Sequence, residues 1–209
     1  MGVQPVYAGR AQRLSLPEPG RVSCVFRPDF VGFYGKLPRR GDFVVNAVPR
    51  GCVDAWDGWA RAALHAGRAA LGEGWTARWM AAPIWRFRLK AGICGADALI
   101  GAFLPSVDAV GRQFPLIVLA GAADPAALVQ GGVWLEGAID AAVAAITLDH
   151  TPEVLATRLR GDYADGALLL HSWWTEGGPY RAASQHDWAG LPEARDFAAM
   201  IADTERVIS

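Results

Sequence analysis

Cysteine is scarce in this chain, and its spacing excludes two classes of protein. The 209 residues contain only Cys24, Cys52 and Cys94, an odd number with no two cysteines close together. Small secreted domains stapled by disulfides carry a denser set of cysteines, and structural zinc sites need closely spaced Cys and His ligands. We therefore expect reduced thiols, no disulfide framework and no metal site.

Long apolar runs and a strong net charge are also absent. No run of 18 apolar residues could form a transmembrane helix, the N-terminus lacks the apolar stretch of a signal peptide, and the formal net charge is −1. The sequence thus predicts a cytoplasmic protein with no membrane insertion and no nucleic-acid partner. The first 50 residues are nevertheless basic, with eight Lys and Arg against three Asp and Glu. A positive face that attracts a protein partner or a phosphate is therefore expected there.

Specific catalytic motifs are missing as well. The chain has no nucleophile elbow, HExxH zinc motif, Walker A loop or dinucleotide-binding fingerprint. Its four histidines are scattered, and none is spaced from a Cys or carboxylate as metal ligands are: His65, His150, His171 and His186. The sequence therefore indicates no cofactor and no catalytic residue.

What the chain does have is enough apolar surface for one sizeable core, since 52% of residues are hydrophobic and nine are Trp. We expect a flexible N-terminal extension over residues 1–28 and one domain over residues 29–209. Helical spacing of apolar residues predicts helices over residues 49–71, 75–80, 133–148, 151–160 and 193–201. Short apolar runs predict strands over 84–89, 98–104, 116–120 and 167–174. This pattern indicates an α/β domain with a mixed, largely antiparallel central sheet covered by helices on both faces.

The sequence also predicts which of several side chains lie in water and which lie in the core. Residues 84–89 alternate apolar and basic residues, which is typical of a strand with one face in water. Glu136 and Asp140 are four residues apart, and we expect them on a solvated helix face. Trp56 and Trp59 lie on the apolar stripe of the 49–71 helix, so both are expected in the core.

Two polar loops interrupt apolar strands and hold the candidate functional residues. The first, residues 35–42 (GKLPRRGD), carries three cations and one carboxylate between glycines. In the second, within residues 103–115 (FLPSVDAVGRQFP), Asp108 and Arg112 are four residues apart and can pair across one helical turn. Ser106 there can bond a nearby backbone amide. Each loop is either an ordinary solvated turn or a docking or anion-binding surface, and these residues leave both interpretations open.

Four separated blocks resemble the TagF family, whose members are associated with bacterial type VI secretion. The blocks are GFYGKLPRRGDFV (32–44), APIWRFRL (82–89), FLPSVDAVGRQFPL (103–116) and HSWWT (171–175). Their order and spacing agree with the family from about residue 30 to residue 200.

The resemblance implies a single-domain α/β/α sandwich and a cytoplasmic, non-enzymatic regulator that represses the secretion apparatus post-translationally. It also implies binding to the forkhead-associated scaffold protein of that system. The displayed parts of the matching blocks supply the candidate partner-binding residues, namely Lys36, Arg39, Arg40, Asp42, Ser106, Asp108 and Arg112. The remaining motif residues are expected to be structural: Gly35, Pro38, Gly41, Pro83, Trp85, Pro105, Gly111, Pro115, Trp173 and Trp174. The alternative is an enzyme or binding module that acts on a small anionic ligand through the Ser106, Asp108 and Arg112 loop.

Overall fold

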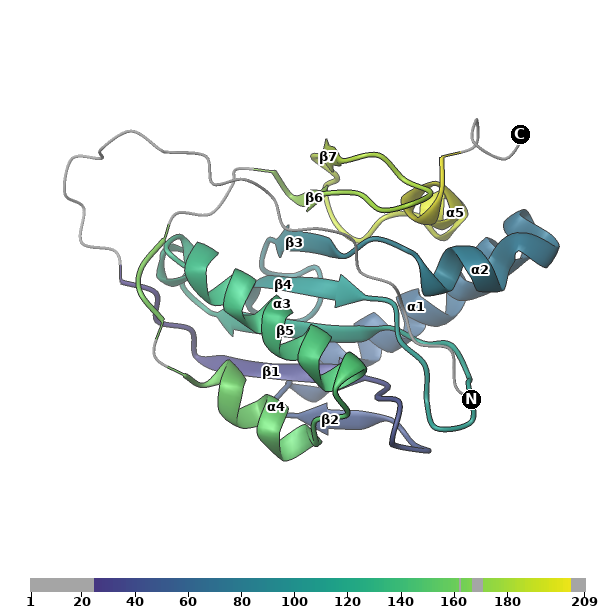
Figure 1. Ribbon diagram of the computed structural model, residues 1–209. Coiled ribbons are helices and arrows are strands. Elements are labelled where there is room, and N and C mark those ends of the chain that lie inside the picture. The colour runs from purple at the N-terminus through teal and green to yellow at the C-terminus, as the bar shows by residue number, and fades with distance from the viewer. Residues whose placement is uncertain (1–24, 162, 167–170, 204–209) are drawn as a thin grey trace.

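The structure is a computed structural model that describes residues 25–161, 163–166 and 171–203. A seven-stranded sheet in the order β2-β1-β5-β4-β3-β6-β7 runs through its centre (Figure 1). The strands are β1 (Phe30–Gly35), β2 (Val44–Asn46), β3 (Trp85–Leu89), β4 (Ala98–Leu104), β5 (Leu116–Ala122), β6 (Trp173–Thr175) and β7 (Ser184–His186). All strand pairs in the sheet are antiparallel, and β3, β4 and β5 form the predicted meander.

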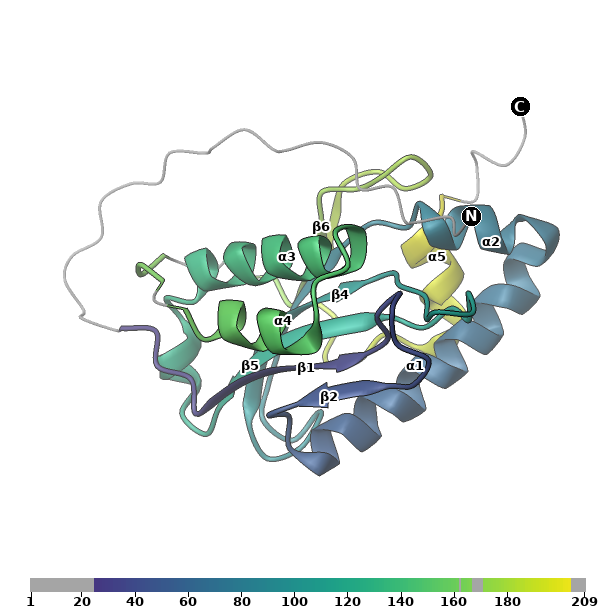
Figure 2. The ribbon, with the colours of Figure 1, turned by 60° about the horizontal axis from the view of Figure 1, so that its bottom comes forward.

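Helices cover both faces of the sheet, which confirms the α/β/α sandwich. They are α1 (Arg50–Leu71), α2 (Trp75–Met80), α3 (Gly132–Thr147), α4 (Pro152–Leu159) and α5 (Phe197–Ile201), with 3-10 turns η1 (Gly72–Gly74), η2 (Pro125–Leu128) and η3 (Ala194–Asp196). Figure 2 shows α3 and α4 on one face and α1 with α5 on the other. The expected helix over 193–201 is therefore a 3-10 turn followed by a short α-helix.

Strand β4 shows how the sequence builds two cores from one sheet. Successive side chains of a strand point to opposite faces, so Leu99 and Phe103 join the core under α1 while Ile100 and Leu104 join the core under α3. Gly101 lies between them because a Cβ there would come within 2.3 Å of a carbonyl oxygen on β5. The run ALIGAFL is thus apolar throughout because both of its faces are covered.

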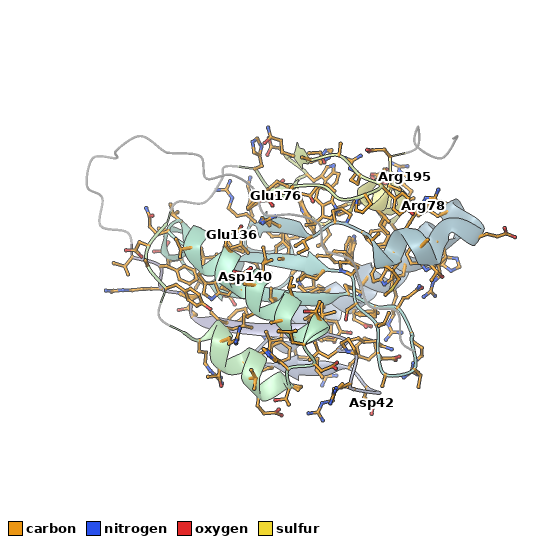
Figure 3. The ribbon with its side chains drawn as sticks, viewed as in Figure 1. Asp42, Arg78, Glu136, Asp140, Glu176 and Arg195 are labelled. Atoms are coloured by element: carbon orange, nitrogen blue, oxygen red, sulfur yellow. The ribbon has the colours of Figure 1, made fainter. Side chains whose placement is uncertain are left out.

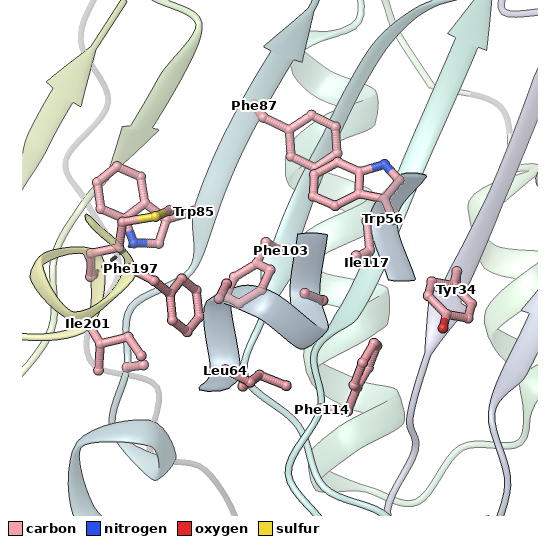
Figure 4. Packing of buried hydrophobic residues seen from close by; sticks show 14 of the residues in the cluster. Tyr34, Trp56, Leu64, Trp85, Phe87, Phe103, Phe114, Ile117, Phe197 and Ile201 are labelled. Atoms are coloured by element: carbon pink, nitrogen blue, oxygen red, sulfur yellow. Dashed lines mark hydrogen bonds between the residues drawn. The ribbon is translucent and has the colours of Figure 1, made fainter. Parts of the chain in front are cut away.

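The core under α1 is built from aromatic rings (Figure 4). Trp56 lies 4.8 Å from the ring of Phe87, and Phe103 packs edge-on against Phe197 of α5 at 5.8 Å. Trp56 is fully buried and Trp59 is partly buried against the same cluster. This confirms the prediction that the apolar stripe of α1 packs in the core.

The prediction of a wet face on β3 is wrong for Arg86, which is only 5% exposed. Its guanidinium donates to both carboxylate oxygens of Glu136 on α3, at 2.7 Å each, and reaches Glu176 at 3.3 Å. Burial alone would lower the pKa of Arg86, but the two carboxylates outweigh it and the pKa is raised. Glu136 is therefore an ion-pair partner rather than a purely solvated residue, and Figure 3 shows it beside Glu176.

The described chain makes contacts before residue 29, where order was expected to begin. The ring of Phe26 packs on Trp134 of α3 at 5.4 Å, and the amide of Arg27 donates to Ala127. The predicted boundary at residue 28 is therefore too late. Residues 1–24 of the expected extension, and residues 167–170 of the expected 167–174 strand, lie outside the described residues.

Cys52 and Cys94 are buried free thiols, and Cys24 lies outside the described residues. Burial raises the pKa of Cys52 to about 11 and that of Cys94 to about 12. Neither thiol is therefore activated as a nucleophile. No helix in the described part of the chain has the length and apolar character needed to cross a bilayer.

Candidate functional site

The structure brings the two polar loops together at the end of the sheet where β1 leads into β2. The amide of Ala109 donates to the carbonyl of Arg40 at 3.1 Å, and Nη2 of Arg112 donates to the carbonyl of Gly41 at 2.6 Å. The loops come from adjacent strands, because β1 pairs with β5 along its whole length. They form one surface, which we call the two-loop surface: residues 36–43 and 105–115.

Asp108 holds the two-loop surface together from inside. Its Oδ2 accepts from Nζ of Lys36 at 2.5 Å and from Nε of Arg112 at 2.6 Å. Its Oδ1 accepts the amides of Val110 and Arg112 at 3.1 and 2.8 Å. Burial alone would raise the pKa of Asp108, but the hydrogen bonds from Lys36 and Arg112 outweigh it and hold the pKa well below its usual range. The predicted pairing of Asp108 with Arg112 is confirmed.

Three of the predicted site residues are not displayed, however. Lys36, Ser106 and Asp108 are 6%, 0% and 3% exposed. The expectation that the whole of both loops faces solvent is therefore wrong, because Lys36 turns inward to neutralise a carboxylate that lies 72 residues away in the sequence. The charged residues that do reach the surface are Arg39, Arg40, Asp42 and Arg112.

Ser106 also has a different role from the expected one. Its hydroxyl donates to the carbonyl of Lys36 at 2.8 Å rather than bonding a neighbouring amide, and its own carbonyl accepts Nε1 of Trp79 at 3.0 Å. A fully buried hydroxyl bonded to the main chain is poorly placed to attack a substrate. This geometry disfavours the interpretation of the loop as an enzyme site.

Gly35 and Gly111 fit the predicted turn roles, but Gly41 does not. Gly35 has φ 140° and lies so close to the carbonyl of Pro115 that a Cβ would approach it to 2.0 Å. Gly111 has φ 82°, in the region that favours glycine. Gly41 has no positive φ and open space around its Cα, and its contribution is the carbonyl that Arg112 binds.

The other structural residues lie in or beside the cores. Trp85 and Trp173 are buried, and their ring nitrogens donate to the carbonyls of Met200 and Gly190 at 2.9 and 3.0 Å. Trp174 is 8% exposed on the opposite face. The remaining prolines lie between elements: Pro38 in the β1–β2 loop, Pro83 before β3, and Pro105 after β4.

Phe43 is a surface residue that the sequence reasoning missed. It is 38% exposed, stacks on Tyr34 at 5.6 Å and meets Phe114 edge-on at 4.7 Å. Two cations flank its ring, with Nζ of Lys36 at 5.1 Å and the guanidinium of Arg61 at 5.6 Å. Its position directly after Asp42, at the end of a polar loop, was the signal available in the sequence.

A small cavity opens beside the two-loop surface and was also missed. It measures about 220 Å³ and lies between the β1–β2 loop and the connection from α3 to α4. Its lining consists of Leu37, Arg39, Arg40, Ala145, Asp149, His150, Thr151 and Pro152. The lining comes from two groups, residues 37–40 and 145–152, which are more than a hundred positions apart in the sequence, so no local pattern could have joined them.

Comparison with known proteins now identifies the family. The family described as the TagF N-terminal domain, type VI secretion system-associated, matches residues 32–161. The chain belongs to this TagF family. The matched span contains both loops of the two-loop surface and all the residues that line the cavity, whereas Trp173 and Trp174 lie beyond it.

A solved structure supports the same assignment. The crystal structure of PA0076 from Pseudomonas aeruginosa PAO1 is similar, with a TM-score of 0.72 and 28% sequence identity. The alignment covers 83% of this chain and 94% of that chain. A comparison with curated proteins finds no significant match. The TagF-type sandwich thus extends across most of the chain, and its family is associated with type VI secretion.

Proposed function

We propose that this TagF-family chain is a non-enzymatic repressor of type VI secretion that acts after translation by binding another protein. The proposed partner is the forkhead-associated scaffold protein of the same system, as the family resemblance implies. Membership of a family associated with type VI secretion supports a role in that system. We place this role in the cytoplasm, as the family resemblance also implies.

The observation that carries this proposal is the construction of the two-loop surface. Arg39, Arg40, Asp42 and Arg112 are exposed, while the buried pair of Lys36 and Asp108 fixes the backbone beneath them. A rigid surface loses little conformational freedom on binding, which favours affinity and specificity. A loop that served only as a connection would not need a buried ion pair.

The alternative, an enzyme that uses the Ser106 loop, has less support. The hydroxyl of Ser106 is buried and bonded to a main-chain carbonyl, and Asp108 is saturated by four donors. The chemistry of this loop is therefore used within the fold rather than offered to a substrate.

Isothermal titration calorimetry of the full chain against the purified scaffold protein tests the proposal. We expect saturable binding that weakens when Arg39, whose side chain is 73% exposed, is changed to Glu, because a carboxylate at this position repels the acidic groups of a partner that the arginine would attract. The matched control is Arg195→Glu, since Arg195 is 78% exposed in its side chain and lies far from Asp42 in Figure 3. Absence of binding by the wild-type chain would refute the proposed partner.

A further inference from the structure

We infer that the cavity beside the two-loop surface receives an acidic side chain, Asp or Glu, from a segment of the partner protein. This inference rests on the proposed function and specifies the chemistry of what binds. Two guanidinium groups, from Arg39 and Arg40, line the cavity against the single carboxylate of Asp149. Guanidinium groups bind carboxylates through paired N–H donors of matching geometry, so the charge complementarity favours an acidic occupant.

Arg40 has a fixed backbone and a loosely held side chain. Its amide donates to Leu37 at 3.0 Å, and its carbonyl accepts from Ala109 at 3.1 Å. Its side chain is 48% exposed and its guanidinium reaches Glu153 only at 3.9 Å. An exposed pair at that separation contributes little stability. A partner carboxylate can therefore replace Glu153 at little cost, while the backbone stays in place.

Arg39 shows that a carboxylate fits this site. Its Nε lies 2.9 Å from Oδ2 of Asp149, while its side chain remains 73% exposed. The guanidinium therefore keeps most of its donors in water beside the cavity. An incoming carboxylate can be shared between Arg39 and Arg40 from the solvent side.

The N-terminus of α4, which also borders the cavity, does not supply the charge. Pro152 has no amide hydrogen, the amide of Val154 bonds to Oγ1 of Thr151 at 3.4 Å, and the amide of Leu155 bonds to the carbonyl of Thr151 at 3.0 Å. Thr151 has thus taken two of the amides at this end of the helix, those of Val154 and Leu155. Arg39 and Arg40 therefore supply the positive charge that binds the acidic side chain.

Two exposed apolar residues lie close in the sequence to the residues that line the cavity. Leu148 and Val154, which flank the cavity-lining residues in the sequence, are 67% and 41% exposed. Protein–protein interfaces combine apolar contacts with polar and charged contacts around them. The partner segment therefore carries an apolar residue next to its acidic one.

The test uses NMR of the full chain with a capped peptide of sequence Leu-Glu-Asp-Glu-Leu-Gly. We expect saturable shifts of the Nε–Hε signals of Arg39 and Arg40, but not of Arg195. The matched peptide Leu-Gln-Asn-Gln-Leu-Gly should leave all three signals in place. Arg40→Glu should weaken binding of the acidic peptide about tenfold, and Leu148→Ser should weaken it more than the distant Val133→Ser does.

Three results would overturn the inference: no shift of the two arginine signals, equal shifts with the neutral peptide, or saturation by inorganic phosphate at lower concentration than by the acidic peptide. The last would reassign the cavity to a phosphate-bearing ligand. This assay needs no scaffold protein. Peptide binding without scaffold binding refutes the proposed partner alone, and scaffold binding without peptide binding refutes the acidic side chain alone.

Discussion

Replacing Asp108 with asparagine should destabilise the fold by about 3–5 kcal/mol, the typical cost of breaking a buried ion pair. Asparagine keeps the shape but replaces one carboxylate oxygen with an NH2 group. In one orientation that group faces the cationic donors of Lys36 and Arg112, and in the other it faces the amides of Val110 and Arg112. Neither orientation satisfies all four donors, and Lys36 is left buried without a counter-charge.

Urea-induced unfolding followed by tryptophan fluorescence measures this loss as a lower midpoint at an unchanged slope. The matched control is Asp42→Asn, an exposed carboxylate in the adjoining loop, which should change stability by no more than about 0.5 kcal/mol. Lys36→Met combined with Asp108→Asn should lose less than the two single changes together, because the unpaired charge is gone.

A loss below about 1 kcal/mol for Asp108→Asn would refute the reasoning. That value is typical of an exposed ion pair. It would mean that water reaches Lys36 and that the two-loop surface is not pinned from inside.

Three further predictions follow the same logic. Ionised Asp108 contributes stability at pH values above its unfolded pKa of about 3.9, and this contribution is lost as the pH falls towards the lower pKa of the folded state. The melting temperature should therefore fall more between pH 5 and pH 3 in the wild type than in Asp108→Asn. Gly35→Ala should cost roughly 3 kcal/mol or more by urea unfolding because a Cβ meets a carbonyl at 2.0 Å, whereas Gly111→Ala, with open space, should cost about 1–2 kcal/mol. Trp56→Ala and Trp85→Ala should each cost about 3–5 kcal/mol, and full thermal stability with impaired binding would show that these rings are interface anchors instead.

The main elements could be predicted from the sequence because each has a local cause. Residues 98–104 and 116–122 are apolar at every position, and Pro105 and Pro115 mark where the strands end. Residues 50–71 carry an apolar stripe with helical spacing, and Gly72, with φ 52°, follows the last helical residue. The pairing of Asp108 with Arg112 is local too, since it spans four residues.

The misplaced residues depend on contacts that are remote in the sequence. Lys36 and Arg86 were expected in water because nothing next to them suggests a partner. Their carboxylates lie 72 and 50 residues away, on another loop and on a helix. The cavity was missed for the same reason, because its two walls meet only when α3 packs on β4 and β5 and α4 packs against β1. Whether a cation within an apolar run is buried or lies in water depends on the residues that cover that face of the sheet.

The central proposal is that the two-loop surface represses type VI secretion by binding the scaffold protein. Its most direct test is the amount of a type VI substrate released by cells that express the chain, compared with cells that express Arg39→Glu/Arg40→Glu or Arg195→Glu at equal protein levels. The account predicts that the wild type and Arg195→Glu suppress release while the double variant, still folded, does not. Equal suppression by all three would contradict it.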